Sequence, residues 1–191
     1  MSETIVSETE NNFSTIGLLN SNQNKITKRE IHNGKSLEKP SSSREHNLIG
    51  SNATIAIGSR VRGQCEIYVN DMRVKLAVNS FCYPDVVIVQ GDPEFEDGET
   101  DLLLNPTVVV EVLSKATICH DKTEKLDCYF AMESIKDCVL VNEDLMRVEH
   151  YAKQTINQWI YRIYQQREDK IPLDSIKCEI SVGELYSRIK V

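Results

Sequence analysis

The chain has 191 residues, of which 40% are hydrophobic and 27% are charged, and its net charge at pH 7 is −7. This size and composition are typical of one globular domain. No apolar run approaches the roughly 18 residues that a membrane span needs, and residues 1–10 lack the order of a secretory signal, so we expect a cytoplasmic protein. The negative charge argues against a protein that coats nucleic acid, although it is compatible with an acidic metal site beside a local basic groove.

Residues 1–26 are predicted to be a disordered tail, and residues 27–191 to form the domain. The tail is rich in Ser, Thr and Asn, and its short apolar pieces show no sustained period. The six cysteines are scattered and form no CxxC pair, which argues against a zinc ribbon or a thioredoxin-type redox site. We therefore interpret them as reduced structural thiols.

The predicted elements begin with a hairpin that turns at Asn33-Gly34. A helix capped by Ser42 or Ser43 follows, because apolar residues recur at helical spacing. Alternating or continuous runs of β-branched residues then predict strands. Two later segments again have apolar residues at helical spacing and are predicted to be helices. The expected helices span 44–62, 121–132 and 182–189, and the expected strands span 65–69, 73–78, 85–89, 107–113, 138–141, 147–151, 158–164 and 178–180.

Glu111 is the most informative residue, because every neighbour along its predicted strand is a large aliphatic. An unpaired buried carboxylate costs several kcal/mol or loses its charge, so the site should supply a cation, either a metal ion or a Lys or Arg. Asp85 opens a second apolar run and poses the same problem, although a carboxylate at a strand end is often only a capping or loop-facing residue. Adjacent strands would bring both carboxylates to one sheet edge, where their hard oxygens suit Mg²⁺ or Mn²⁺.

The predicted helix after Glu111 carries a lysine that could reach the carboxylates. Asp121, Lys125 and Tyr129 are spaced i, i+4, i+8 and should share one face. Lys125 could then orient a water molecule or offset phosphate charge, which with two carboxylates and a metal is the minimum for phosphodiester hydrolysis. The alternative is that Lys125 is an ordinary solvated helix residue.

Several linked motifs resemble the Uma-type endonuclease family of the PD-(D/E)XK, restriction-endonuclease-like superfamily. They are Tyr83-Pro-Asp-Val-Val-Ile-Val89, Gly91-Asp-Pro-Glu-Phe95, Leu104-Asn-Pro-Thr-Val-Val-Val-Glu-Val-Leu-Ser114 and Asp121-Lys-Thr-Glu-Lys125, followed by Tyr129, Val139-Leu-Val-Asn142, Val148-Glu-His-Tyr151 and Leu185-Tyr186. The likeness covers roughly residues 28–191 and is dense from Asp71 onward.

The resemblance implies an α/β (α+β) fold in which a mixed β-sheet is flanked by helices. It also implies that Asp85 and Glu111 bind the metal and that Lys125 replaces the lysine that classical members carry two residues after the glutamate, where this chain has Leu113. Asp71 and His46 match family positions near the site. Asp71 could instead be a turn residue, and His46 a capped surface histidine.

One position departs from the family pattern. The family usually has an acidic residue after the glycine of its first turn, and this chain has Lys35 in Ile31-His-Asn-Gly-Lys35. A lysine there would repel a cation, so metal binding is weakened, or Glu30 or Glu38 substitutes, or the alignment slips.

The sequence thus predicts a Mg²⁺- or Mn²⁺-dependent DNA endonuclease. Two alternatives stay open, namely an inactive binding module with the same fold and a hydrolase of small phosphodiesters. The apolar strands near Trp159 could also supply a homodimer interface.

Overall fold

The computed structural model of the protein describes residues 28–32, 35–39, 42–114 and 121–191. The predicted tail, residues 1–26, lies outside the described residues. In chain order the elements are β1 (Arg29–His32), β2 (Lys35–Glu38), α2 (Arg44–Gly58), β3 (Cys65–Val69), β4 (Arg73–Ala77), β5 (Ser80–Cys82), β6 (Val86–Gln90), β7 (Leu102–Leu103), β8 (Val108–Leu113), η1 (Asp121–Lys125), α4 (Leu126–Ala131), β9 (Asp137–Asn142), β10 (Val148–Thr155), β11 (Gln158–Tyr164), β12 (Lys170–Leu173), η2 (Asp174–Ile176), β13 (Cys178–Ser181) and α5 (Val182–Leu185).

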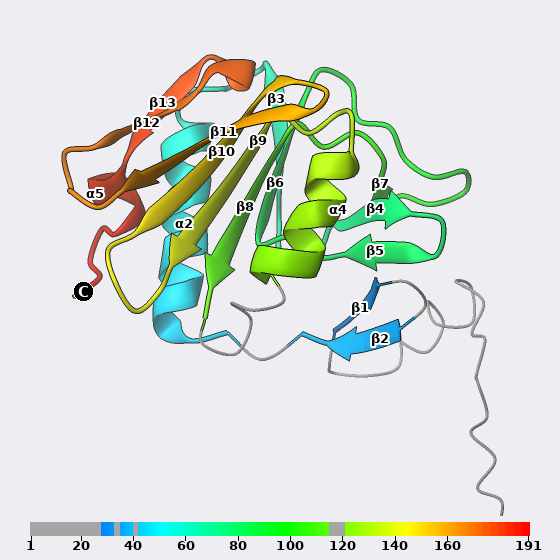
Figure 1. Ribbon diagram of the computed structural model, residues 1–191, viewed down its shortest axis with the longest axis horizontal. Helices are drawn as coiled ribbons and strands as arrows, with labels where there is room; N and C mark the ends of the chain where they lie inside the picture. Colours follow the sequence, from blue (N-terminus) through cyan, green and yellow to red (C-terminus); the bar gives the residue numbers. More distant parts are fainter. Residues whose placement is uncertain (1–27, 33–34, 40–41, 115–120) are drawn as a thin grey trace, which may run out of the picture.

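A six-stranded mixed sheet forms the centre of the molecule, with strand order β11-β10-β9-β8-β6-β3 (Figure 1). Strands β8 and β9 are parallel, while the other neighbouring pairs in this sheet are antiparallel. A parallel pair needs a crossover connection, and the segment that carries η1 and α4 supplies it. The mixed sheet with flanking helices confirms the predicted fold class.

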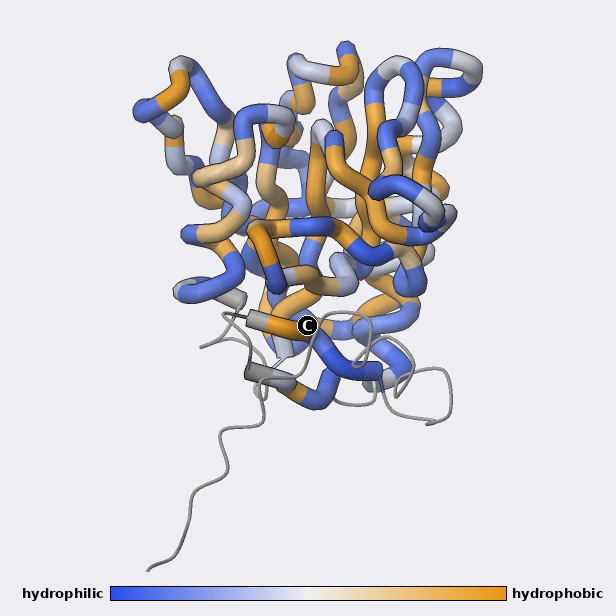
Figure 2. Tube along the Cα trace, turned by 90° about the vertical axis from the view of Figure 1, so that its right-hand side faces the viewer, coloured by the Kyte–Doolittle hydropathy of each residue, from blue (hydrophilic) through white to orange (hydrophobic). Residues whose placement is uncertain are grey.

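Both faces of the central strand β8 are buried, as the aliphatic residues on either side of Glu111 predicted. Val108, Val110 and Val112 face the core beneath α2, where they pack with Ile49, Ala53 and Ile57 among others. Val109 and Leu113 face a second core that includes Leu126 and Tyr129 of α4. Figure 2 shows these apolar strands gathered inside more hydrophilic loops. Because side chains alternate along a strand, Glu111 belongs to the face that α4 covers.

A second sheet, with order β2-β1-β5-β4-β7, places the N-terminal hairpin beside the central sheet. Strand β1 pairs with β2 and joins β5 through Ile31 and Phe81, which are both buried together with Leu102. The hairpin predicted around Asn33-Gly34 is therefore confirmed for the strands, although the two turn residues are outside the described residues. This attachment brings Glu30 close to Tyr83, just before β6.

The predicted cap of α2 is confirmed, because the Ser43 side chain accepts a hydrogen bond from His46 N at 2.9 Å. The helix ends at Gly58, four residues before the predicted end, and residues 59–62 continue as turns. The predicted helix 121–132 begins as a π-helix over Asp121–Lys125 and becomes α-helical at Leu126. Strands β5, β7 and β12 were not predicted, because each has four residues or fewer and no recognisable alternation.

Within the described residues, no helix is both long and apolar enough to cross a membrane.

The Tyr186 hydroxyl ties the C-terminal helix to the turn after β9. It lies 2.6 Å from Asn142 O, and it accepts a hydrogen bond from Arg147 N at 3.1 Å. We expect Tyr186→Phe to lower the free energy of unfolding by about 1–3 kcal/mol, because buried backbone groups lose their partner. Urea unfolding of the variant against wild type measures this, and an unchanged midpoint would show that water replaces the hydroxyl at no cost.

Candidate active site

Asp85 and Glu111 face each other where β6 and β8 meet. Their strands pair antiparallel with Val86 opposite Val110, so Asp85 and Glu111 occupy the next register position on each strand. The backbone amide of Val112 donates to Asp85 Oδ2 at 2.8 Å. Both carboxylates are buried, with side chains 3% and 2% exposed. The structure thus brings the two predicted carboxylates together.

Lys125 and Tyr129 both point at Glu111. Lys125 Nζ lies 2.8 Å from Glu111 Oε1, and the Tyr129 hydroxyl donates to the same oxygen at 2.5 Å. Lys125 is itself 1% exposed, so it is a buried ammonium rather than a solvated helix residue. The sequence predicted a cation beside buried Glu111, and in this structure that cation is the Lys125 ammonium. The π-helical turn before α4 delivers Lys125 to this position, a feature often found at functional sites.

Glu30 is a third buried carboxylate of the site. Its Oε1 lies 3.1 Å from Lys125 Nζ and accepts a hydrogen bond from Tyr83 N at 2.9 Å. Glu38, the other residue named as a substitute for the missing acid, pairs instead with Arg29 and is 59% exposed. Of the two, Glu30 is the one that stands beside the predicted site.

Two basic side chains flank Asp85 Oδ1. Lys39 Nζ donates to it at 2.9 Å, and His46 Nε2 lies 3.1 Å away. Burial raises the pKa of Asp85, but the neighbouring His46 imidazole and Lys39 ammonium more than offset this and hold it well below its usual range. Asp85 is therefore an ionised carboxylate at neutral pH.

Tyr129 is held as a neutral phenol. Its hydroxyl lies between Glu111 Oε1 and Cys82 Sγ, which is 3.2 Å away. Burial, followed by the nearby Cys82 and Glu111, raises its pKa well above the ordinary value. Tyr129 is thus a hydrogen-bond donor that fixes the orientation of the Glu111 carboxylate.

The remaining predicted residues are placed differently. His46 reaches Asp85 from the first turn of α2, so its side chain is buried and not a surface residue. Asp71 does not join the cluster, because its side chain is 81% exposed and pairs with Lys28 in the turn between β3 and β4. The side chains of Asp121 and Lys35 lie outside the described residues.

Sequence reasoning missed Lys39 entirely. Besides Asp85 Oδ1, its ammonium contacts Tyr83 O at 2.7 Å, and its backbone amide bonds Lys28 O at the open end of the hairpin. The residue follows a short polar strand and precedes Pro40, so nothing local marks it as buried. Only the docking of the hairpin against β5 brings it to the site.

The donor set suits a hard divalent cation better than zinc. Across the ranges that the structure describes, no three His, Cys, Asp or Glu side chains are arranged to hold one metal ion. Zinc usually takes three or four such ligands, whereas Mg²⁺ takes one or two carboxylates and completes its shell with water and substrate oxygens. Ionised Asp85 next to Glu111 therefore fits Mg²⁺ or Mn²⁺ by donor type.

Comparison with known proteins identifies the family of the chain. A family model with the description "Uma2: Putative restriction endonuclease" matches residues 18–183, which is most of the chain. The chain belongs to the Uma2 family. The match includes the strands and helices that carry Glu30, Asp85, Glu111 and Lys125.

Relatives and a solved structure extend the comparison. An uncharacterized protein of Synechocystis is 33% identical over 138 residues, covering 70% of this chain and 76% of the relative. A second one from the same organism is 27% identical over 161 residues, covering 83% of each. The crystal structure of a putative nuclease of the DUF820 family from Anabaena variabilis superposes with a TM-score of 0.72 and 18% identity, covering 92% of this chain and 98% of that one. This last likeness confirms the fold.

Proposed function

We propose that this Uma2-family protein is a Mg²⁺- or Mn²⁺-dependent DNA endonuclease that hydrolyses phosphodiester bonds. The observation that carries the proposal is the buried cluster in which Asp85 and Glu111 meet where β6 pairs with β8, beside Lys125. Isolated buried charges are costly, so a fold that gathers three carboxylates in one cluster uses them for chemistry more readily than for stability. The family description supports a nuclease, and DNA is the substrate class it suggests.

Each residue has a role that follows from its contacts. Asp85 and Glu111 would hold the metal, which when bound would polarise the phosphate and activate a water molecule. Lys125 would donate hydrogen bonds to that water or to the phosphate, while Glu30 keeps its ammonium near the carboxylates. Tyr129 orients Glu111, and the Val112 amide and His46 orient Asp85.

One observation favours the alternative of an inactive binding module. The Lys39 ammonium contacts Asp85 Oδ1, the oxygen not engaged by the Val112 amide. A cation already held by the protein offsets the charge that a metal would neutralise. The third reading, a hydrolase of small phosphodiesters, would use the same carboxylates, so substrate tests must separate it from DNA cleavage.

The test compares substrates and metals with one protein preparation. Supercoiled plasmid, single-stranded DNA and bis(p-nitrophenyl) phosphate are each incubated with Mg²⁺, Mn²⁺ or EDTA. We expect metal-dependent nicking that EDTA abolishes and that Asp85→Asn lacks. Turnover of the small phosphodiester without any DNA cleavage would reject the endonuclease and favour the third reading.

A homodimer through the strands near Trp159 stays a prediction. Trp159 packs on Phe130 with ring centroids 4.6 Å apart, and β11 is an edge strand of the central sheet. Sedimentation of the wild-type protein would give its oligomeric state directly.

A further inference from the structure

The charges around Asp85 and Glu111 are largely compensated by the protein itself. Among the residues that the structure describes, the buried carboxylates Glu30, Asp85 and Glu111 are contacted by the ammonium groups of Lys39 and Lys125. A divalent cation that entered this cluster would be repelled by both ammonium groups at short range in a poorly solvated environment. One of them must therefore give way before a metal can bind.

Lys39 stands where the metal would bind Asp85. Asp85 Oδ2 is engaged by the Val112 amide at 2.8 Å, which leaves Oδ1 as the oxygen able to turn to a new ligand. Lys39 Nζ donates to that oxygen at 2.9 Å and also to Tyr83 O at 2.7 Å. An ammonium with two such hydrogen bonds fills the position that a metal ion would need.

We propose that Lys39 is a built-in competitor of the metal, so that divalent cation binding requires its ammonium to leave Asp85 Oδ1. This inference rests on the proposed function, because it concerns how the same site is kept closed. The competition sets the affinity of the site for a divalent cation below that of a site without this lysine, so a higher metal concentration is needed to fill it.

Lys39 is the ammonium that can leave, and Lys125 is not. The Lys39 side chain is 15% exposed, whereas that of Lys125 is 2% exposed and is held by both Glu30 and Glu111. A lysine has a flexible four-carbon stem, so its ammonium can swing to solvent while the backbone keeps its bond to Lys28 O. Lys125 would have to break its contacts with two buried carboxylates, at 3.1 Å from Glu30 and 2.8 Å from Glu111.

The test measures Mn²⁺ binding to the metal-free protein by calorimetry and by the loss of the free-ion paramagnetic resonance signal. We expect Lys39→Met to bind Mn²⁺ about tenfold tighter or more, since a hydrogen bond to a charged group accounts for a factor of that size. Lys39→Gln is prepared as well, so that a folding defect of one variant does not decide the result. Thermal melting confirms that each variant is folded.

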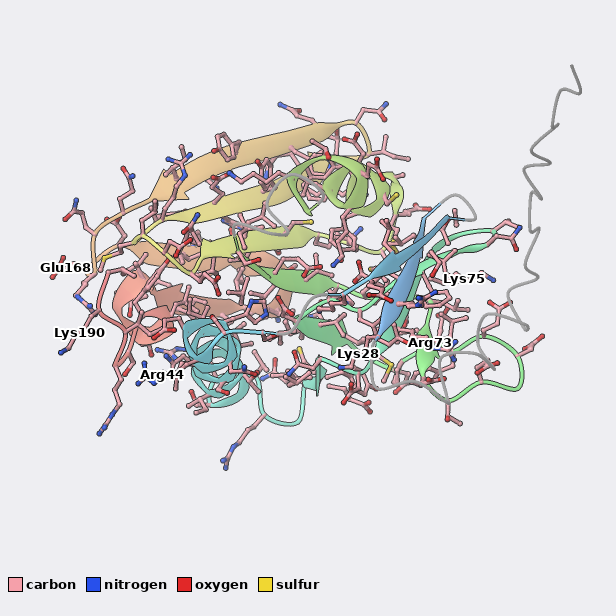
Figure 3. All side chains as sticks on the ribbon, turned by 90° about the horizontal axis from the view of Figure 1, so that it is seen from below. Lys28, Arg44, Arg73, Lys75, Glu168 and Lys190 are labelled. Atoms are coloured by element: carbon pink, nitrogen blue, oxygen red, sulfur yellow. The ribbon has the colours of Figure 1, made fainter. Side chains whose placement is uncertain are left out.

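Lys28→Met is the matched control. Lys28 lies across from Lys39 at the open end of the hairpin, but its ammonium pairs with Asp71 and contacts Asn70 O instead of Asp85; Figure 3 labels it. Its loss removes the same unit of charge without touching Asp85, so Mn²⁺ affinity should change by less than about twofold, as expected of a screened surface charge.

The outcomes separate this inference from the proposed function. Tighter Mn²⁺ binding by the Lys39 variants supports the inference even if no variant cleaves DNA, in which case the nuclease proposal alone fails. Equal or weaker binding by folded Lys39 variants overturns it, whether or not wild type cleaves. Absence of binding by every protein also overturns it, because removing the competitor should create a measurable site.

Discussion

Glu111→Gln should lose metal-dependent DNA cleavage by a factor on the order of 10³ or more, because it removes a charge from one of the two proposed metal ligands. The substitution preserves the size of the side chain and its ability to accept from Tyr129, whose hydroxyl lies 2.5 Å from Oε1. The fold should therefore survive while the negative charge is lost. Initial rates of plasmid nicking, with thermal melting as a check of folding, measure the effect.

Glu38→Gln is the control for this variant. Glu38 is a carboxylate of the same N-terminal hairpin as Glu30, but its side chain is 59% exposed and pairs with Arg29. We expect its cleavage rate to stay within about twofold of wild type, since an exposed ion pair contributes little. If Glu111→Gln cleaved as fast as Glu38→Gln, Glu111 would have no role in metal binding.

Lys125→Met should be the most destabilising single change at the site, lowering the free energy of unfolding by about 3–5 kcal/mol in metal-free buffer. That is the range for a buried ion pair that loses one partner. Glu30 and Glu111, with side chains 6% and 2% exposed, would be left without the ammonium that lies 3.1 and 2.8 Å from them. Urea unfolding in the presence of EDTA measures the loss.

Two further variants decide whether charge explains that loss. Lys136→Met removes an exposed lysine whose ammonium bonds only Glu133 O among the described contacts, so its unfolding midpoint should stay near that of wild type. The double variant Lys125→Met/Glu30→Gln also removes the charge of one of the two carboxylates that Lys125 contacts. It should recover part of the stability, because the free-energy effects of substitutions at contacting residues are not additive. If the double variant recovered no stability, the loss would come from the packing of the lysine stem and not from its charge.

The carboxylates could be predicted because their signal is local. Glu111 is flanked by aliphatic residues on a strand buried on both faces, and Asp85 precedes a β-branched run that pairs with it. Lys125 and Tyr129 followed from helical spacing, although the π-helical start of the helix was not predicted. The contacts themselves join residues close in the chain, with 27 positions between Asp85 and Val112 and 18 between Tyr129 and Glu111.

The rest of the site depends on contacts that no local pattern contains. Glu30 meets Lys125 across 95 positions, and Lys39 meets Asp85 across 46. Both pairs exist because the hairpin attaches to β5, a three-residue strand that sequence reasoning did not predict. The charge reversal at Lys35 drew attention to this hairpin, and among the hairpin side chains that the structure describes, the Lys39 ammonium is the one that contacts Asp85.

Lys39 and Lys125 both lie among the buried carboxylates of the site. A site with two lysines among three carboxylates is less dependent on a metal for its stability than one with carboxylates alone. The protein can therefore fold around this cluster without a metal ion. Metal binding would then require the Lys39 ammonium to leave Asp85 Oδ1.

The most direct test of the nuclease site is nicking of supercoiled plasmid in Mn²⁺ by wild type, Glu111→Ala and Lys35→Glu in parallel. We predict that wild type nicks the plasmid, that Glu111→Ala does not, and that Lys35→Glu is at least as active as wild type. Activity of Glu111→Ala equal to wild type would contradict the site. Failure of all three folded proteins to cleave would contradict DNA cleavage as the function of this chain.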